Sequence, residues 1–223
     1  MNKEVNDPGP EWKQVCDKDG VKAWYAHPTP EHYAVRLEGT VNAPLAYVLT
    51  LLFEADLYHK WVPYYTVFGH QSTRKIYSPP QNAKQFLAIS RYKLMWPFAD
   101  REAVLACEGI DAMDDDKPMV YVLMHAPTDG YPGTKIPPAE KGIVRAKIFP
   151  SGFTIAPITE TKSKLCVLFQ GDPEMHAPDK LVNFIIKNFA PMMIKRIDSA
   201  YFFILRFLKT FRCTVVLRTV FFF

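Results

Sequence analysis

Hydrophobic and polar residues alternate over much of the chain before residue 172, which predicts β-strands. The alternating runs end at turn-forming clusters such as Asp17–Gly20. The predicted strands are Trp12–Cys16, Val21–Ala26, His32–Val41, Val67–Tyr77, Lys84–Leu94, Ala103–Asp111, Met119–His125, Gly142–Phe149, Thr154–Thr159 and Leu165–Gly171. Short links rich in Pro, Asp and Gly connect many of them, which favours an antiparallel sheet.

The period changes from two to about 3.6 over Pro44–Leu57, which predicts a helix. Its apolar residues recur at three- and four-residue steps: Leu45, Val48, Leu49, Leu52 and Phe53. Pro44 suits a first helical position, and Asn42 is a candidate cap for the same helix.

A second helix is predicted from Lys180 onward, and it is much more apolar. Its polar residues fall on one narrow stripe, formed by Lys180, Asn183, Lys187, Pro191, Lys195 and Asp198. The remaining face is broad and apolar, so other elements must cover it on more than one side. Pro191 removes a backbone donor inside this helix and is expected to bend it.

The order of elements is three strands, a helix, a run of strands and one long helix, which indicates an α+β fold with a curved sheet around the last helix. We expect one domain at residues 11–200, after a flexible arm at residues 1–10. Residues 201–223 form a basic-aromatic tail with four cations, Arg206, Lys209, Arg212 and Arg218. An interfacial anchor, a continuation of the helix, a non-native tail and a segment that needs a partner remain open for it.

Composition narrows the class of protein. Of the 223 residues, 48% are hydrophobic and 22% are charged, with a net charge of +4, which fits a folded domain. The cations are spread along the chain, so a nucleic-acid partner is not expected, whereas contact with an anionic membrane surface fits. The start of the chain has no apolar run, and no two of the four cysteines form a C-x-x-C pair, so we expect a cytoplasmic protein with free thiols. We also expect a monomer that is peripheral to membranes.

Motifs of catalysis are absent from the sequence. It contains no G-x-S-x-G, no H-E-x-x-H, no phosphate-binding loop and no G-x-G-x-x-G, and its six histidines show no metal-ligand spacing. We therefore expect neither an enzyme, nor a cofactor, nor a metal site.

Three separated stretches together resemble the START family, the steroidogenic-acute-regulatory-related lipid-transfer domain. They are EGTVNAP at residues 38–44 followed by YHKW at 58–61, WPFADRE at 96–102, and DPE at 172–174 leading to LVN at 181–183 and KNFAP at 187–191. The resemblance runs from about Trp12 to Ile197. It implies a helix-grip fold, in which a curved antiparallel sheet cradles the C-terminal helix and encloses an apolar tunnel for a lipid.

One departure limits what the resemblance implies about the ligand. Members that bind phosphatidylcholine carry an Arg and an Asp around the Trp, roughly R-x-x-W-D, whereas Tyr58 and Val62 hold these positions around Trp61. Phosphatidylcholine is therefore not implied, and the class of lipid stays open.

The predicted tunnel lining combines strand residues of one parity with one side of the last helix. It consists of Val144, Ala146, Ile148, Leu181, Phe184, Ile185, Phe189, Met192 and Met193. Candidates for polar contacts with a ligand are Arg91, Arg101, Glu102 and His125, although a structural pair between Arg101 and Glu102 is the plainer interpretation. We expect Trp61 to pack under the end of the helix, and Pro191 to act in the gate through which the lipid enters.

The expected function is binding, and transfer between membranes, of a lipid or sterol without catalysis. Two alternatives stay open. One is a cyclase-like enzyme on the same helix-grip fold, which would need polar groups that converge inside the cavity. The other is a membrane-tethered regulatory domain that senses a lipid.

Overall fold

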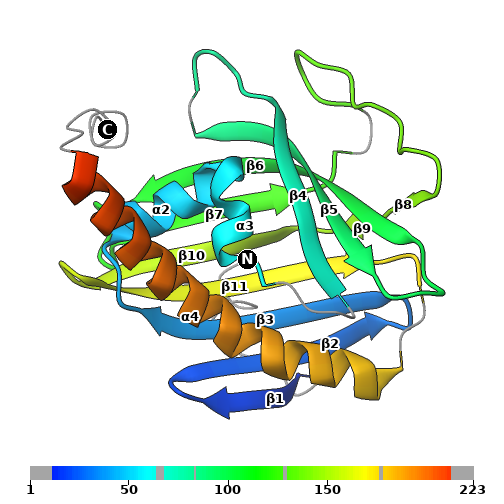
Figure 1. Cartoon of the computed structure of the whole chain (residues 1–223), viewed down its shortest axis with the longest axis horizontal. Helices are drawn as coiled ribbons and strands as arrows, with labels where there is room; N and C mark the ends of the chain where they lie inside the picture. The colour runs from blue at the N-terminus through cyan, green and yellow to red at the C-terminus, as the bar shows by residue number, and fades with distance from the viewer. Residues whose placement is uncertain (1–11, 64–67, 83, 128–129, 176–177, 212–223) are drawn as a thin grey trace.

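The computed structural model describes residues 12–63, 68–82, 84–127, 130–175 and 178–211, with side chains described up to residue 202 apart from that of Phe68. The predicted arm at residues 1–10 and the last part of the tail, from residue 212, lie outside the described residues. Figure 1 shows a large bent sheet that carries its helices on one side.

The sheet contains eleven strands: β1 (Lys13–Lys18), β2 (Val21–Thr29), β3 (His32–Val41), β4 (Phe68–Tyr77), β5 (Gln85–Leu94), β6 (Asp100–Ala112), β7 (Met119–His125), β8 (Ile143–Arg145), β9 (Lys147–Ile148), β10 (Ser151–Thr159) and β11 (Lys162–Asp172). Their order is β1-β2-β3-β11-β10-β7-β6-β5-β4, while β8 pairs with β6 and β9 with β11. β3 thus lies beside β11, so the first strands and the last strand of the chain are neighbours in the sheet. The path ends at β1 and β4, so pairing between described strands does not close the sheet into a barrel.

The predicted strand Gly142–Phe149 is divided in the structure. β8 runs parallel to β6, whereas β9 pairs with β11 in the antiparallel sense. Ala146 lies between the two short strands, and its N–H donates to the Glu102 carbonyl at 2.9 Å. The segment changes partner within a few residues, which the alternation of its side chains does not reveal.

The predicted helix at Pro44–Leu57 is also interrupted. It consists of α2 (Leu45–Phe53), the 3₁₀ turn η1 (Ala55–Leu57) and α3 (Tyr58–Trp61). The break lies at Glu54, whose backbone is extended. It turns Trp61 into the core, where the indole N–H donates to the Leu51 carbonyl at 3.1 Å, so the prediction that Trp61 is packed is confirmed.

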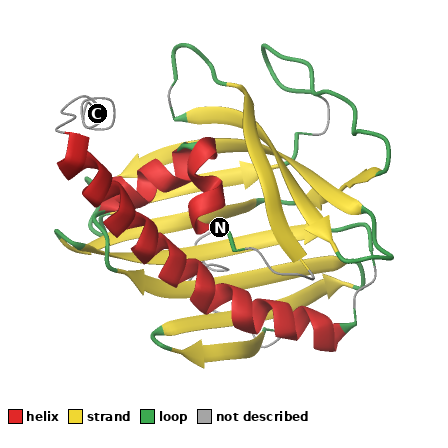
Figure 2. Cartoon of the chain, viewed as in Figure 1, coloured by secondary structure: helices red, strands yellow, loops and turns green. Residues whose placement is uncertain are grey.

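The last helix, α4 (Asp179–Phe211), begins one residue before the predicted start and continues through the first half of the predicted tail. Its 33 residues correspond to a length of roughly 50 Å. It crosses the sheet obliquely on the same side as α2 and α3 (Figure 2). The helix approaches β3 closely at Gly39, where an added Cβ would lie 3.0 Å from the Ile194 side chain.

Together these elements form the α+β arrangement that the order of elements indicated, and the helix-grip fold that the family resemblance implied. We call the face of the sheet under α2, α3 and α4 the inner face, and the opposite face the outer face. On β6, Ala103, Leu105 and Cys107 belong to the inner core, whereas Val104 and Ala106 belong to a separate outer cluster. Adjacent residues of a strand point to opposite faces, so parity decides which side chains can meet a ligand inside.

Candidate functional site

The inner face and α4 together form one continuous apolar core. Strands from both ends of the strand order contribute buried side chains to it, including Tyr25, Leu37, Phe86, Leu105 and Leu165. α2 contributes Val48 and Leu51, α3 contributes Trp61, and α4 contributes one stripe of its surface. This core is the region in which the sequence placed the ligand.

One stripe of α4 faces this core. Its members recur at three- and four-residue steps and are Val182, Ile186, Phe189, Ala190, Met193, Ile194, Ile197 and Ala200. Of the helix residues predicted as lining, Phe189 and Met193 lie in the stripe. Leu181, Ile185 and Met192 are half-buried and lie beside it, and Phe184 is 55% exposed.

The predicted lining of α4 and its buried stripe differ by a rotation about the helix axis. Its apolar face is wider than the stripe that the sheet covers, so apolarity alone does not show which part turns inward. Ile186 and Ile194, which sequence reasoning missed, occupy central positions of the buried stripe. Their equal spacing from Ala190 was a signal, but the neighbouring apolar residues offered a second stripe of similar quality.

The predicted strand lining is divided between two environments. Ile148 is buried in the inner core, and Ala146 is half-buried against it. Val144 is half-buried but lies outside that core, at the point where β8 pairs with Arg101. The structure therefore brings only part of this segment to the interior.

Polar groups on β4 and β5 interrupt the apolar interior. His70 Nε2 lies 2.8 Å from Thr73 Oγ1, which lies 2.8 Å from Ser90 Oγ. Ser90 and His70 are buried, and the His70 ring lies near the rings of Tyr58 and Tyr92. Burial, together with the nearby His59 and Arg196, lowers the pKa of His70, which keeps the imidazole neutral.

Sequence reasoning missed this cluster for a structural reason. The register of β4 against β5 shifts between His70 and Ser72, so simple alternation fails there. His70 and Thr73 can thus share partners although their sequence positions have opposite parity.

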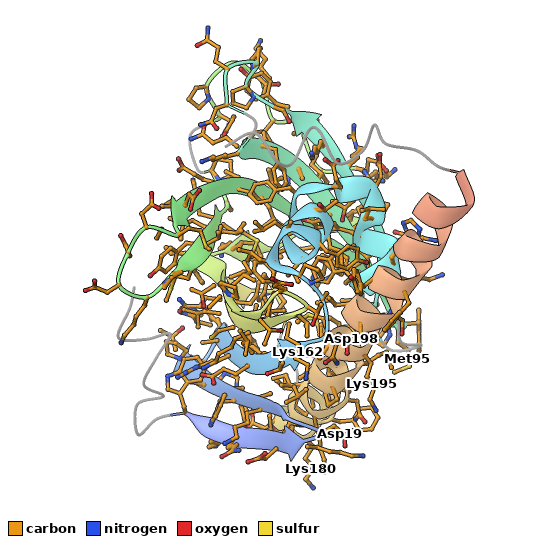
Figure 3. The ribbon with its side chains drawn as sticks, turned by 90° about the vertical axis from the view of Figure 1, so that its left-hand side faces the viewer. Asp19, Met95, Lys162, Lys180, Lys195 and Asp198 are labelled. Carbon is orange, nitrogen blue, oxygen red and sulfur yellow. The ribbon has the colours of Figure 1, made fainter. Side chains whose placement is uncertain are left out.

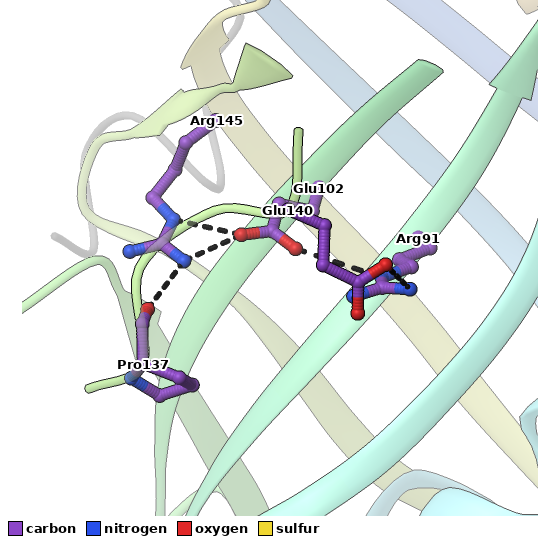
Figure 4. A network of polar contacts seen from close by, with 5 residues as sticks. All are labelled: Arg91, Glu102, Pro137, Glu140 and Arg145. Carbon is purple, nitrogen blue, oxygen red and sulfur yellow. Dashed lines mark hydrogen bonds and ion pairs between the residues drawn. The ribbon is translucent and has the colours of Figure 1, made fainter. Parts of the chain in front are cut away.

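The predicted polar contacts Arg91 and Glu102 point away from the interior. They lie on the outer face, where Glu102 is almost fully buried between Arg91 and Arg145 (Figure 4). Glu102 accepts from Arg145 Nε at 3.0 Å, and Arg91 Nη1 donates to Glu140 at 2.9 Å. His125 is exposed at the end of β7. Parity explains all three positions, because the inner side chains of these strands are their neighbours.

Arg101 does not pair with Glu102, because the two adjacent side chains lie on opposite faces. Instead Arg101 donates to three backbone carbonyls, those of Pro173 (2.5 Å), Ala99 (2.6 Å) and Glu174 (3.1 Å). Arg101 therefore ties the start of β6 to the segment that leads into α4.

The turn next to this contact exposes large apolar side chains. Trp96 is 87% exposed, Met95 is 50% exposed and Phe98 is 36% exposed. All three belong to the β5–β6 turn, which the Arg101 contacts hold beside the entry to α4. Three exposed apolar side chains within four consecutive residues, Met95–Phe98, form a patch rather than scattered single residues.

The attachment of α4 is uneven along its length. After Pro191, Arg196 donates to the carbonyls of Lys60 (3.1 Å) and His59 (2.9 Å), and Asp198 accepts from Asn42. Before Pro191, Asp179 lies 3.4 Å from His27. The second half of the helix thus carries most of the polar contacts that fix it to α3 and to the end of β3.

Neither a metal cluster nor a reactive cysteine occurs among the described residues. Within them, no group of three His, Cys, Asp or Glu side chains is arranged to hold a metal ion. Cys16, Cys107 and Cys166 are buried free thiols, and burial raises the pKa of Cys107 to about 12. A thiol with so high a pKa is protonated at neutral pH and is a poor nucleophile.

The family model for the START domain matches residues 1–201. The chain belongs to the START domain family. No curated protein sequence matches this START domain significantly.

Solved structures show the same fold at low sequence identity. Human STARD10 matches with a TM-score of 0.73 at 15% identity, over 94% of this START domain and 80% of that chain. Human StAR-related lipid transfer protein 5 matches at 0.71 and 17% identity, over 91% of each chain. A StAR-related lipid transfer protein from Xanthomonas axonopodis matches at 0.65 and 18%, over 86% of this START domain and 98% of that chain.

Proposed function

We propose that this START domain binds one lipid or sterol between α4 and the inner face of the sheet and transfers it between membranes without catalysis. The observation that carries the proposal is the apolar character of both surfaces, the buried stripe of α4 and the facing strands. Membership of the START family supports it, as does the fold shared with a protein named for lipid transfer. The proposed tunnel is the space that the ligand occupies between these two surfaces.

The energetic demand on such a carrier is large. Exposing a hydrocarbon chain to water costs about 0.8 kcal/mol per CH₂, so a chain of about sixteen carbons costs on the order of 10 kcal/mol. The carrier has to replace the bilayer with an apolar surface of comparable extent. Met193 and Phe189 suit this task, because a flexible thioether and an aromatic ring adapt to differently shaped apolar bodies.

The cluster of His70, Thr73 and Ser90 is the proposed contact for the polar end of the ligand. A neutral imidazole and two hydroxyl groups exchange hydrogen bonds with a hydroxyl or a carbonyl, but they do not balance a buried charge. A sterol or another lipid with an uncharged head therefore fits this interior better than a lipid with a charged headgroup.

Entry of the lipid requires part of the wall to move. The proposed moving part is the first half of α4, with Pro191 as its hinge, because the contacts of Arg196 and Asp198 hold the second half. Phe184 lies in the first half and is exposed, so it is available to contact a membrane while the helix opens.

The proposed membrane contact is the patch of Met95, Trp96 and Phe98. It lies beside the entry to α4, where a lipid would pass. Within the described residues, no helix is long and apolar enough to cross a bilayer. We propose transient, peripheral contact with a cytoplasmic membrane surface, made by the protein as a monomer.

Native mass spectrometry of protein purified from cells, followed by lipid extraction, tests the proposed function. We expect a co-purified lipid or sterol at a ratio of one to one, and a transfer rate between vesicles that rises with protein concentration. Protein that carries no lipid, and that takes up neither sterol nor phospholipid from vesicles, contradicts the proposal. Conversion of the extracted molecule during incubation favours the enzyme alternative.

A further inference from the structure

The sheet has a gap in its strand pairing along one side of β6. β6 pairs with β8 through Asp100–Glu102 and with β7 from Ala106 onward. Between these stretches, no described strand pairs with this side of β6. A pocket of about 860 Å³ opens here, with Val104, Ala126 and Ala146 among its lining residues.

An ionic network holds one side of this pocket in place. Arg145 Nη2 donates to Glu102 at 2.5 Å and to the Pro137 carbonyl at 2.8 Å, while Arg91 binds Glu140 (Figure 4). Glu102 is 1% exposed, so its charge is balanced by the two arginines rather than by water. The loop between β7 and β8 is thereby fixed to the sheet at Pro137 and Glu140.

Apolar contacts hold the other side. Tyr131 and Ile136 pack against the outer cluster formed by Leu87, Ile89, Val104 and Ala106. The Tyr131 ring also lies edge-on to Tyr77 at 5.9 Å, and Tyr131 forms a β-bridge with Thr134. These contacts attach the loop to the sheet between Tyr131 and Glu140, so a ligand does not have to order this part of the pocket wall.

The charged side chains among the described lining residues are cations. Lys135 and Arg145 line the pocket, and no Asp or Glu occurs among the described residues that do so. The contacts of Arg145 use Nε and Nη2, so within the described part of the chain Nη1 has no hydrogen-bond partner. A guanidinium N–H beside an apolar floor is a ready donor for an anionic group.

We propose that this pocket is a second binding site, which takes a small amphiphilic anion. The ligand has an apolar or aromatic body that rests on Val104 and Ile136 and one sulfonate, carboxylate or phosphate group that reaches Lys135 and Arg145. The volume falls in the range of about 300–1,000 Å³ that is usual for small-molecule sites, and the lining combines apolar residues with Lys135 and Arg145. Val104 and Ile136, on which the ligand would rest, belong to the outer cluster, so the proposal does not depend on the lipid function proposed for the interior.

Two fluorescent probes with the same aromatic body test the site. The first is 1-anilinonaphthalene-8-sulfonate, and the second is its neutral analogue N-phenyl-1-naphthylamine. We expect the sulfonate to bind the wild-type chain more tightly, and the variant Lys135→Glu to weaken its binding by roughly fivefold or more, because a cation becomes an anion. Binding of the neutral probe should not change.

The matched control is Lys117→Glu, which makes the same charge change at the exposed β6–β7 turn. ¹H–¹⁵N NMR locates the probe, with shifts expected at the amides of Thr134, Lys135 and Ile136. The proposal is overturned if Lys117→Glu and Lys135→Glu weaken the sulfonate equally, if the neutral probe binds as tightly as the sulfonate, or if the shifts map only to α4 and the inner strands. This last result would still be compatible with lipid binding inside, so the two proposals fail separately.

Discussion

Asp198 on α4 accepts two hydrogen bonds from Asn42, one from its backbone N–H at 2.7 Å and one from its side-chain amide at 3.0 Å. The sequence predicted Asn42 as a cap of the helix that follows, but α2 has no side-chain cap. Asn42 instead connects the end of β3 to a residue 156 positions later. This connection fixes the second half of α4, which the proposed gate requires.

Replacing Asp198 by Ala should destabilise the domain by about 1–2 kcal/mol, because two hydrogen bonds to a carboxylate are lost at a partly exposed site. Urea unfolding followed by circular dichroism measures the change. Lys195→Ala on the same helix is the control, since the side chain of Lys195 forms an exposed ion pair with Asp19 at 3.3 Å. Figure 3 labels both residues and Asp198. Equal losses in both variants would show that the Asp198 contact contributes nothing specific.

Replacing Pro191 by Ala should slow lipid transfer between vesicles. The new N–H completes the hydrogen-bond ladder of α4, which stiffens the proposed hinge and raises the free energy of unfolding by up to about 3 kcal/mol. Transfer of a fluorescent sterol between donor and acceptor vesicles gives the rate. Pro118→Ala, in the exposed β6–β7 turn, is the control and should leave the rate unchanged. A hinge at Pro191 is refuted by a variant that is more stable but transfers at the wild-type rate.

Replacing Trp96 by Ala should weaken binding to vesicles on the order of tenfold, because a large exposed aromatic side chain no longer enters the membrane interface. Stability should hardly change, since Trp96 makes few contacts at 87% exposure. Co-sedimentation with vesicles measures the binding. The control is Ile110→Ala, which removes another exposed apolar side chain, 43% exposed, near the opposite end of β6. Similar losses in the two variants would mean that the β5–β6 turn is not the contact site.

Acidification should destabilise the protein through His70. Burial lowers the pKa of His70 in the folded state, whereas the unfolded chain titrates near the ordinary value of about 6.5. Between these two values the unfolded state binds more protons, so the free energy of unfolding falls as the pH drops below about 6.5. The loss is complete below the folded pKa and amounts to about 1.4 kcal/mol per unit of pKa difference.

The variant His70→Asn should reduce this pH dependence. Urea unfolding at a series of pH values between 7.5 and 5 compares it with wild type and with His125→Asn, which alters an exposed histidine. We expect a flatter profile only for His70→Asn. A profile as steep as that of the wild type would assign the acid sensitivity to other groups.

Much of the fold could be predicted from local patterns. Every predicted strand overlaps an observed strand, and the long helix from Lys180 is present. The interruptions could not be predicted, since the break at Glu54 and the change of partner at Ala146 depend on segments far away in the chain.

The candidate site was less accessible to sequence reasoning. Arg101 and Glu102 looked like a pair because they are adjacent, yet alternation places them on opposite faces. Their real partners, Pro173 and Arg145, come from other elements. The outer pocket carried no sequence signal, because it arises where the pairing of β7 and β8 with β6 leaves part of β6 without a partner strand on that side among the described residues.

The sequence by itself determined the order of strands and helices and the apolar character of α4. Both follow from the pattern of polar and apolar residues two to four positions apart. Only the tertiary structure decided that Ile186 and Ile194 face the sheet while Phe184 faces solvent. The apolar face of α4 is wider than the surface that covers it, so the shape of the sheet, built from residues throughout the chain, selects the buried stripe.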